Sequence, residues 1–76
     1  MINAAEYVKA ETEAAMTAIS MSVLSYSDIG ETDTVATLME MASNLSSTAL
    51  KLVLGEATQD EHELWEAIIQ DIREGL

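Results

Sequence analysis

Apolar residues recur at intervals of three and four positions through residues 33–54, which is the clearest periodic pattern in the chain. The repeating positions are Val35, Leu38, Ala42, Leu45, Ala49 and Leu52. This spacing places the side chains on one face of an α-helix, where they can pack against a neighbouring helix. Four further apolar side chains widen the face: Met39, Met41, Leu50 and Val53. We therefore predict that this helix contacts two neighbours.

The segment of residues 4–27 carries two apolar stripes at helical spacing. One consists of Val8, Thr12, Ala15, Ile19, Val23 and Tyr26, and the other consists of Ala4, Tyr7, Ala14, Ala18 and Met21. No charged residue occurs from Ala14 to Ser27. A helix that is uncharged on all sides is normally buried over most of its circumference. Such burial is hard to achieve within a chain of three helices.

Residues 59–74 form the third predicted helix, with one apolar face and an acidic back. The apolar face contains Trp65, Ile68 and Ile72, with Leu64, Ile69 and Leu76 beside it. Thr58 and Glu61 have the spacing of a capping box, in which each residue accepts a hydrogen bond from the other's backbone N–H. Asn3 and Glu6 have the same spacing at the start of the first helix.

Glycines mark the ends of the first two predicted helices. Gly30 and Gly55 suit the left-handed backbone conformation that commonly ends a helix, because glycine has no Cβ to resist it. Thr32 or Asp33 is expected to cap the second helix. Residues 1–76 are therefore predicted to be a single all-α domain. Two long helices form a hairpin in it, and a third amphipathic helix packs against them as part of a dimeric bundle.

The second stripe of the first helix is the predicted dimer interface. The third helix can cover one side of the hairpin but not both, so an apolar face is left over. Packing against a second copy buries that face, and small side chains allow the helices to approach closely. The residues of this predicted homodimer interface are Tyr7, Ala14, Ala18 and Met21. The alternative is a monomer in which the serines and threonines at positions 17, 20, 22, 25 and 27 form a wettable surface.

The charge balance narrows the class of function. The chain has 76 residues, with 14 acidic side chains against three basic ones and a formal net charge of -11 at pH 7. The electric field of such a charge repels nucleic acid and anionic membranes, so we expect no direct binding to nucleic acid or to a membrane. The same field attracts basic protein surfaces.

The short length excludes a multidomain enzyme, and the lack of cysteine excludes thiolate catalysis. Without a signal-peptide pattern or a long apolar run, the expected location is the cytoplasm.

One short motif bears on catalysis. His62, Glu63 and Glu66 resemble part of the zincin signature, in which two histidines one helical turn apart bind zinc and a glutamate acts as the base. Glu66 stands where the second histidine is needed, and the chain has no other histidine. The alternative interpretation is an ordinary histidine among solvated carboxylates. We therefore expect no enzyme activity, no metal site and no cofactor.

A short stretch resembles the start of the second helix of acyl carrier proteins. The residues that carry the resemblance are Asp28–Gly30, Asp33–Val35 and Leu38–Met39. That family attaches phosphopantetheine to the serine of an Asp-Ser-Leu motif between the first two of these pieces. Here Glu31 and Thr32 fill that interval, so the attachment serine is absent and no carrier function is inferred.

The density of acidic residues is itself a candidate functional feature. Residues 56–76 contain seven acids and a single arginine, more charge than solubility requires. The predicted partner-binding residues are Asp28, Glu31, Asp33, Asp60, Glu63, Glu66, Asp71 and Glu74.

These acids predict an interaction protein that inhibits or modulates a partner by docking on its basic surface, with carboxylates where nucleic-acid phosphates would lie. Phage-encoded inhibitors and immunity proteins of nuclease toxins act in this way. One alternative is a self-assembling helical adaptor or chaperone-like protein that binds through apolar helix faces, for which methionines are suited. A further alternative is that the acidic face is only solvated.

Overall fold

The computed structural model describes residues 4–75 and consists of three α-helices, α1 (Ala4–Asp28), α2 (Thr32–Leu54) and α3 (Gln59–Arg73). Within the described range there is no β-strand. The prediction of an all-α chain with three helices is therefore confirmed. The predicted cap at Asn3 and the predicted apolar contribution of Leu76 lie outside the described residues.

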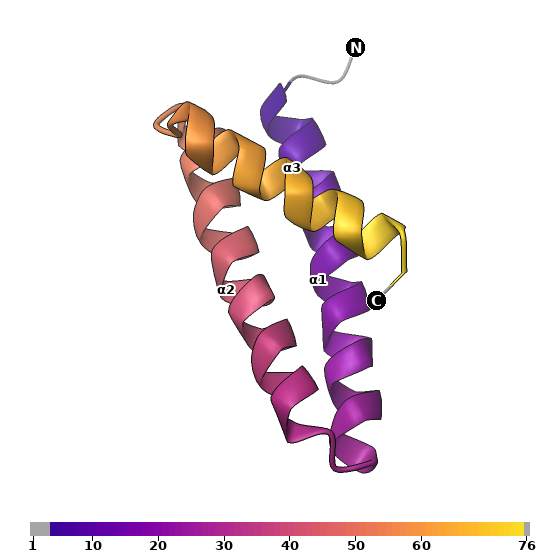
Figure 1. Ribbon diagram of the computed structural model, residues 1–76. Coiled ribbons are helices and arrows are strands. Elements are labelled where there is room, and N and C mark those ends of the chain that lie inside the picture. Colours follow the sequence, from indigo (N-terminus) through magenta and orange to yellow (C-terminus); the bar gives the residue numbers. More distant parts are fainter. Residues whose placement is uncertain (1–3, 76) are drawn as a thin grey trace.

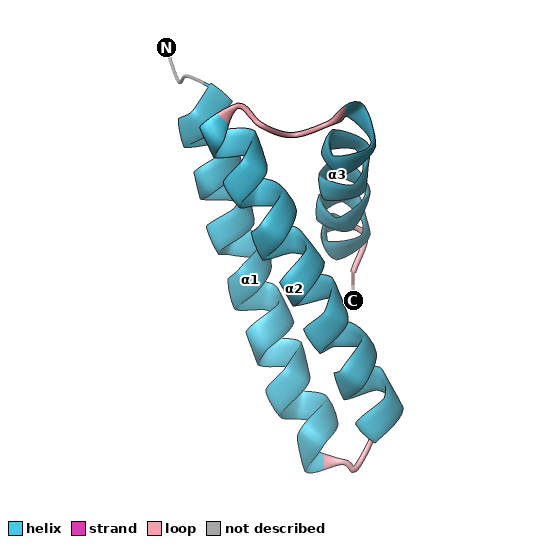
Figure 2. Cartoon of the chain, turned by 90° about the vertical axis from the view of Figure 1, so that its left-hand side faces the viewer, coloured by secondary structure: helices cyan, strands magenta, loops and turns pink. Residues whose placement is uncertain are grey.

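The helices form two layers. α1 and α2 lie side by side and run in opposite directions, and α3 crosses them on one side only (Figures 1 and 2). The molecule measures 41 × 24 × 18 Å along its principal axes. The crossing lies toward the end of the pair where α1 begins and α2 finishes, far from the turn that joins α1 to α2 (Figure 1). Much of the α1–α2 pair therefore has no third helix over it.

The turn between α1 and α2 is short and closed by backbone hydrogen bonds. Gly30 has a φ of 76°, and the following Glu31 N–H donates to the Tyr26 carbonyl at 3.0 Å. This is the usual geometry of a helix end capped by glycine. Glu31 is also the N-cap of α2, although its side chain makes no capping hydrogen bond. The predicted cap at Thr32 or Asp33 is wrong, because the turn leaves only Glu31 between Gly30 and the first residue of α2.

The boundaries around the second connection agree with the local sequence signals. Gly55 ends α2 with a φ of 75°. At the start of α3, the Glu61 N–H donates to Thr58 Oγ1 at 3.2 Å, and the Thr58 N–H donates to Glu61 Oε1 at 3.0 Å. The predicted capping box is therefore confirmed. It satisfies N–H groups that have no partner within the helix.

Each helix contributes three apolar side chains to one core. They are Val8, Ala15 and Ile19 of α1, Leu38, Leu45 and Ala49 of α2, and Trp65, Ile68 and Ile69 of α3. All nine belong to apolar faces predicted from the spacing. The widened part of the α2 face behaves differently, because Met39 and Leu50 remain 61% exposed. The prediction that this helix contacts two neighbours is confirmed, since α2 packs against both α1 and α3, but these contacts leave Met39 and Leu50 largely exposed.

Contacts between distant parts of the chain determine where α3 crosses. Trp65 is buried, and its indole N–H donates to Thr12 Oγ1 of α1 at 3.0 Å. Two ion pairs also join α3 to the other layer: Arg73 with Glu11, and Glu61 with Lys51. α3 is therefore attached to both helices of the first layer.

Candidate protein-binding surface

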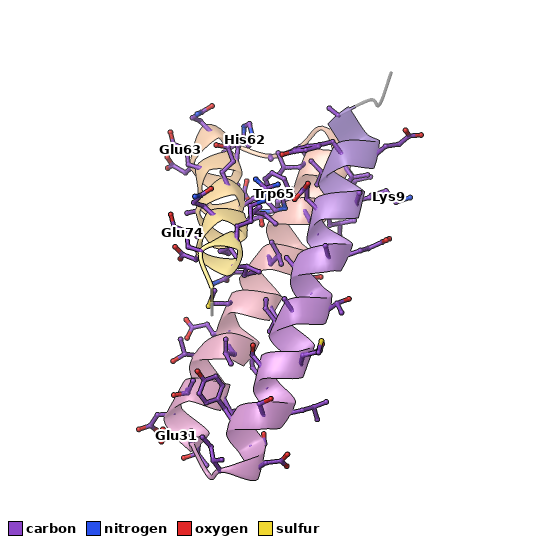
Figure 3. The ribbon with its side chains drawn as sticks, turned by 90° about the vertical axis from the view of Figure 1, so that its right-hand side faces the viewer. Lys9, Glu31, His62, Glu63, Trp65 and Glu74 are labelled. Carbon is purple, nitrogen blue, oxygen red and sulfur yellow. The ribbon has the colours of Figure 1, made fainter. Side chains whose placement is uncertain are left out.

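The acidic side chains predicted to bind a partner are all exposed, but the structure divides them into two groups. Five belong to α3 and the residue that caps it: Asp60, Glu63, Glu66, Asp71 and Glu74. Three lie at the turn between α1 and α2: Asp28 ends α1, Glu31 is the N-cap of α2, and Asp33 is in the first turn of α2. Glu63 and Glu74 project outward from α3, whereas Glu31 lies at the far end of the α1–α2 pair (Figure 3). The two groups therefore form separate surfaces.

Side chains one helical turn apart orient three of the α3 carboxylates. Gln59 donates to Glu63 at 3.2 Å, and Gln70 donates to Glu74 at 3.0 Å. The remaining pair is formed by His62 and Glu66, whose Nε2 and Oε1 atoms are 2.8 Å apart. Residues at this spacing are neighbours on a helix surface. The carboxylates are thus held in place by polar groups that do not cancel their charge, apart from His62 when it is protonated.

The basic residues on α3 and beside it, Arg73 and Lys51, are already paired with other acids. Lys51 hydrogen-bonds the carboxylate of Glu61, and this contact, with the Thr58 N–H, lowers the pKa of Glu61 from 4.5 to about 2. Arg73 pairs with Glu11, and the hydrogen bonds that its guanidinium donates to Glu11 and Tyr7 raise the pKa of Arg73. Neither cation neutralises the outward-facing carboxylates. The outer surface of α3 is therefore available to cations from another molecule.

A groove of about 760 Å³ lies beside these carboxylates, between the first part of α1 and α3. Tyr7 and Trp65 form part of its wall, with ring centroids 6.2 Å apart and planes inclined at 70°. Glu63, Glu66 and Arg73 also line it. Arg73 is already paired with Glu11, so Glu63 and Glu66 are the carboxylates left for an incoming basic side chain, which would be attracted both to them and to an aromatic ring.

The spacing of the sequence did not reveal this groove. Tyr7 was predicted to face a second copy of the chain, and it is 46% exposed. Its ring also makes a T-shaped contact with Trp65, which lies 58 positions later. No periodic pattern links residues so far apart, because their proximity depends on where α3 crosses α1.

The other residues of the predicted dimer stripe lie along α1 away from the groove. Ala14 and Met21 are exposed, and Ala18 is half-buried. A homodimer through this stripe stays a prediction.

The three zincin-like residues lie on the surface of α3, where His62 contacts Glu66 and Glu63 accepts a hydrogen bond from Gln59. Within residues 4–75, no group of three histidine, aspartate or glutamate side chains is positioned to hold a metal ion. In the same range, no helix combines the length and apolar character needed to cross a membrane.

Comparison of the chain with protein-family models, with curated proteins and with solved structures found no match. The chemistry of the α3 surface is therefore the basis for assigning a function.

Proposed function

We propose that this chain is a small acidic interaction protein of the cytoplasm that docks α3 on a basic surface of another protein and thereby inhibits or modulates that protein. The observation that carries the proposal is the row of exposed α3 carboxylates beside a groove with aromatic walls. A net charge of -11 adds long-range attraction, which accelerates association with a basic partner.

The groove supplies the most specific contact of the proposed complex. A lysine or arginine of the partner enters between Tyr7 and Glu66, where the ring face and the carboxylate both attract it. Such a cation–π contact is worth about 0.5–2 kcal/mol, depending on how far it is desolvated. Glu63 and Glu74, on the outer surface of α3, contribute charge at the rim of the interface (Figure 3).

The class of partner follows from the same chemistry. A protein surface that normally binds nucleic acid presents lysines and arginines to phosphates. Carboxylates on α3 occupy the same cations, so the complex excludes the nucleic acid. We therefore propose that the partner has a basic surface of the kind that binds nucleic acid, and that this chain competes for it.

The test uses two double variants with the same change in charge. Glu63→Lys with Glu66→Lys reverses two α3 carboxylates, and Asp28→Lys with Glu31→Lys reverses two at the far turn. All four residues are exposed, so both variants should keep the helical circular dichroism of the wild type. A partner is first isolated from lysate of the source cell with tagged protein at low salt, and its affinity for each variant is then measured.

We expect the α3 variant to weaken the complex at least ~100-fold, since like charges brought together at an interface cost several kcal/mol. The turn variant should change the affinity only a few-fold. The affinity of the wild-type complex should also fall as salt is added. Binding of the wild-type chain should displace any nucleic acid that the partner holds. Equal effects of the two variants, or an affinity that salt does not change, would contradict the proposal.

The second candidate is a self-assembling helical adaptor or chaperone-like protein that binds through apolar helix faces. It is favoured by the exposure of large apolar side chains on the first layer: Met21, Leu24, Met39 and Leu50 are each more than 60% exposed. A complex formed through these side chains should persist at high salt, because apolar contacts are not screened. The same measurement therefore separates the two candidates.

A further inference from the structure

The α1–α2 pair has an uncovered face on the side away from α3. Two hollows lie in the groove between the helices there. One, of about 360 Å³, is lined by Lys9, Thr12, Glu13, Ala49, Leu50 and Val53. The other, of about 350 Å³, is lined by Ile19, Ser20, Val23, Leu24, Met39 and Ala42. We call this surface the back face.

Helical periodicity shows that both hollows belong to one face. Their lining residues are related by steps of eleven positions: Lys9 to Ser20, Thr12 to Val23, Glu13 to Leu24, Met39 to Leu50, and Ala42 to Val53. Eleven residues make about three helical turns, so each residue lies directly along the helix from its counterpart. Glu11, which pairs with Arg73 of α3, lies about 200° around α1 from Lys9 and from Glu13. The back face is therefore opposite α3, in agreement with the one-sided position of α3 in Figure 2.

The back face is nearly free of charge, although the chain has a net charge of -11. Of the residues that line the two hollows, only Lys9 and Glu13 are charged, and both belong to α1. Large apolar side chains border the hollows instead: Leu24 is 67% exposed, and Met39 and Leu50 are 61% exposed. A basic partner gains nothing from such a surface, whereas an equally uncharged apolar surface covers it at no electrostatic cost.

We propose that the back face is covered by a second copy of this chain, in a two-fold symmetric dimer with the two copies antiparallel. In this arrangement α1 lies over α1 of the second copy, and α2 lies over its α2. The acidic α3 helices are then on the two outer sides, which keeps their carboxylates away from the other copy. An acidic back face would not allow such a dimer, because the carboxylates of the two copies would repel each other.

The shape of the back face is complementary to itself in this arrangement. The hollows span residues 9–24 on α1 and 39–53 on α2, so their midpoints fall at Met16 and Ser46. A two-fold axis through this midpoint brings the first hollow of one copy over the second hollow of the other. Leu50 then comes to the level of Ala42 in the second copy, where an unfilled hollow receives it. A symmetric interface requires this pairing of projections and hollows on one surface.

The size of the back face also suits a dimer. The molecule is 41 Å long and at least 18 Å wide, so a face along its length has a footprint on the order of 700 Å², near the ~800 Å² that each partner buries in a standard interface. A single docked helix of about 10 Å diameter would leave much of the width uncovered.

The first test compares the mass in solution of the wild type and of two variants by sedimentation. Leu50→Glu places a charge inside the proposed contact, and Ala14→Glu places the same charge on the other exposed stripe of α1. Both residues are exposed in the single chain, so both variants should keep the wild-type helical signal. We expect a wild-type dimer, at least ~100-fold weaker dimerisation of Leu50→Glu, and an unchanged dimer of Ala14→Glu.

Two results would overturn the proposal. One is a wild-type chain that remains monomeric at ~100 µM, which would mean that no tight dimer forms. The other is dissociation by Ala14→Glu but not by Leu50→Glu, which would place the interface on the stripe of Tyr7, Ala14, Ala18 and Met21.

A second test examines the antiparallel arrangement by disulfide cross-linking. Because the chain contains no cysteine, an introduced cysteine is the only thiol that can react. Ser46→Cys places a thiol near the two-fold axis, next to its symmetry mate, whereas Ser47→Cys turns the thiol about 100° around α2. Both serines are exposed. Under mild oxidation we expect a disulfide-linked dimer from Ser46→Cys and not from Ser47→Cys, since a disulfide needs Cα atoms within about 7 Å. Equal cross-linking of the two variants would overturn this arrangement.

Discussion

Trp65 should be the side chain on which the position of α3 depends most. It is only 3% exposed, its ring contacts Tyr7 edge-on, and its indole N–H donates to Thr12. Replacing a buried tryptophan by alanine typically costs about 3–5 kcal/mol. A chain of 76 residues is expected to have a total stability of about 4–11 kcal/mol, at 0.05–0.15 kcal/mol per residue. Trp65→Ala therefore removes a large part of the stability.

The loss should be visible in the helical signal. An isolated helix of 15 residues is marginal in water, so α3 is expected to unfold when it detaches. The three helices contain 25, 23 and 15 residues, and α3 therefore carries about a quarter of the helical circular dichroism. The assay is urea denaturation followed by circular dichroism at one fixed protein concentration, because self-association would shift the apparent stability.

The variant Thr12→Val isolates the hydrogen bond from the packing. Valine has a similar shape but cannot accept the indole proton, so the N–H of Trp65 is left buried without a partner. The expected cost is about 1–3 kcal/mol with α3 still folded. A stability loss below about 1 kcal/mol for Trp65→Ala, or a full α3 signal in that variant, would refute the view that Trp65 anchors the helix.

Three further predictions concern the connections between helices. Thr58→Ala removes the capping oxygen of α3 and should cost about 1 kcal/mol in urea denaturation, whereas Thr58→Ser should cost little. Gly55→Ala forces a side chain into a backbone with a φ of 75° and should lower the stability by about 1–2 kcal/mol, although nothing lies within 4 Å to clash; an unchanged midpoint would argue against this cap. The pKa of Glu61 in the folded chain is lowered from 4.5 to about 2. The contribution of ionised Glu61 to the stability of the fold is therefore complete above pH 4.5 and is lost as the pH falls toward 2. Glu61→Gln, which keeps the capping geometry, should therefore destabilise the chain at pH 7 and show a smaller loss of stability than wild type between pH 4.5 and pH 2.

The ends of the helices and their buried faces follow from local rules, and the sequence predicted most of them. Gly55 and the Thr58–Glu61 pair act within a few residues, so their geometry does not depend on the rest of the chain. The stripe that includes Leu45 was equally clear, because the period of 3.6 residues places its members on one face whatever they pack against. The exception is the start of α2, where the N-cap is Glu31 and not Thr32 or Asp33.

The position of α3 was decided only in the tertiary structure. It depends on contacts such as those of Trp65 with Thr12 and of Arg73 with Glu11, which lie 53 and 62 positions apart and leave no periodic trace. The position of α3 places its carboxylates far from Glu31, although the sequence analysis had grouped all of these acids as one partner-binding set. It also creates the groove at Tyr7 and leaves the back face uncovered.

The sequence by itself therefore determined three amphipathic helices, their core-facing residues and a strongly acidic surface. Each of these properties is fixed by neighbours along the chain or by the sum of its charges. The tertiary structure alone decided which carboxylates share a surface and which apolar side chains remain exposed. The physical reason is that α3 covers only one side of the α1–α2 pair. Two residues with the same local pattern therefore differ in burial: Met41 packs against the core, whereas Met39 stays exposed.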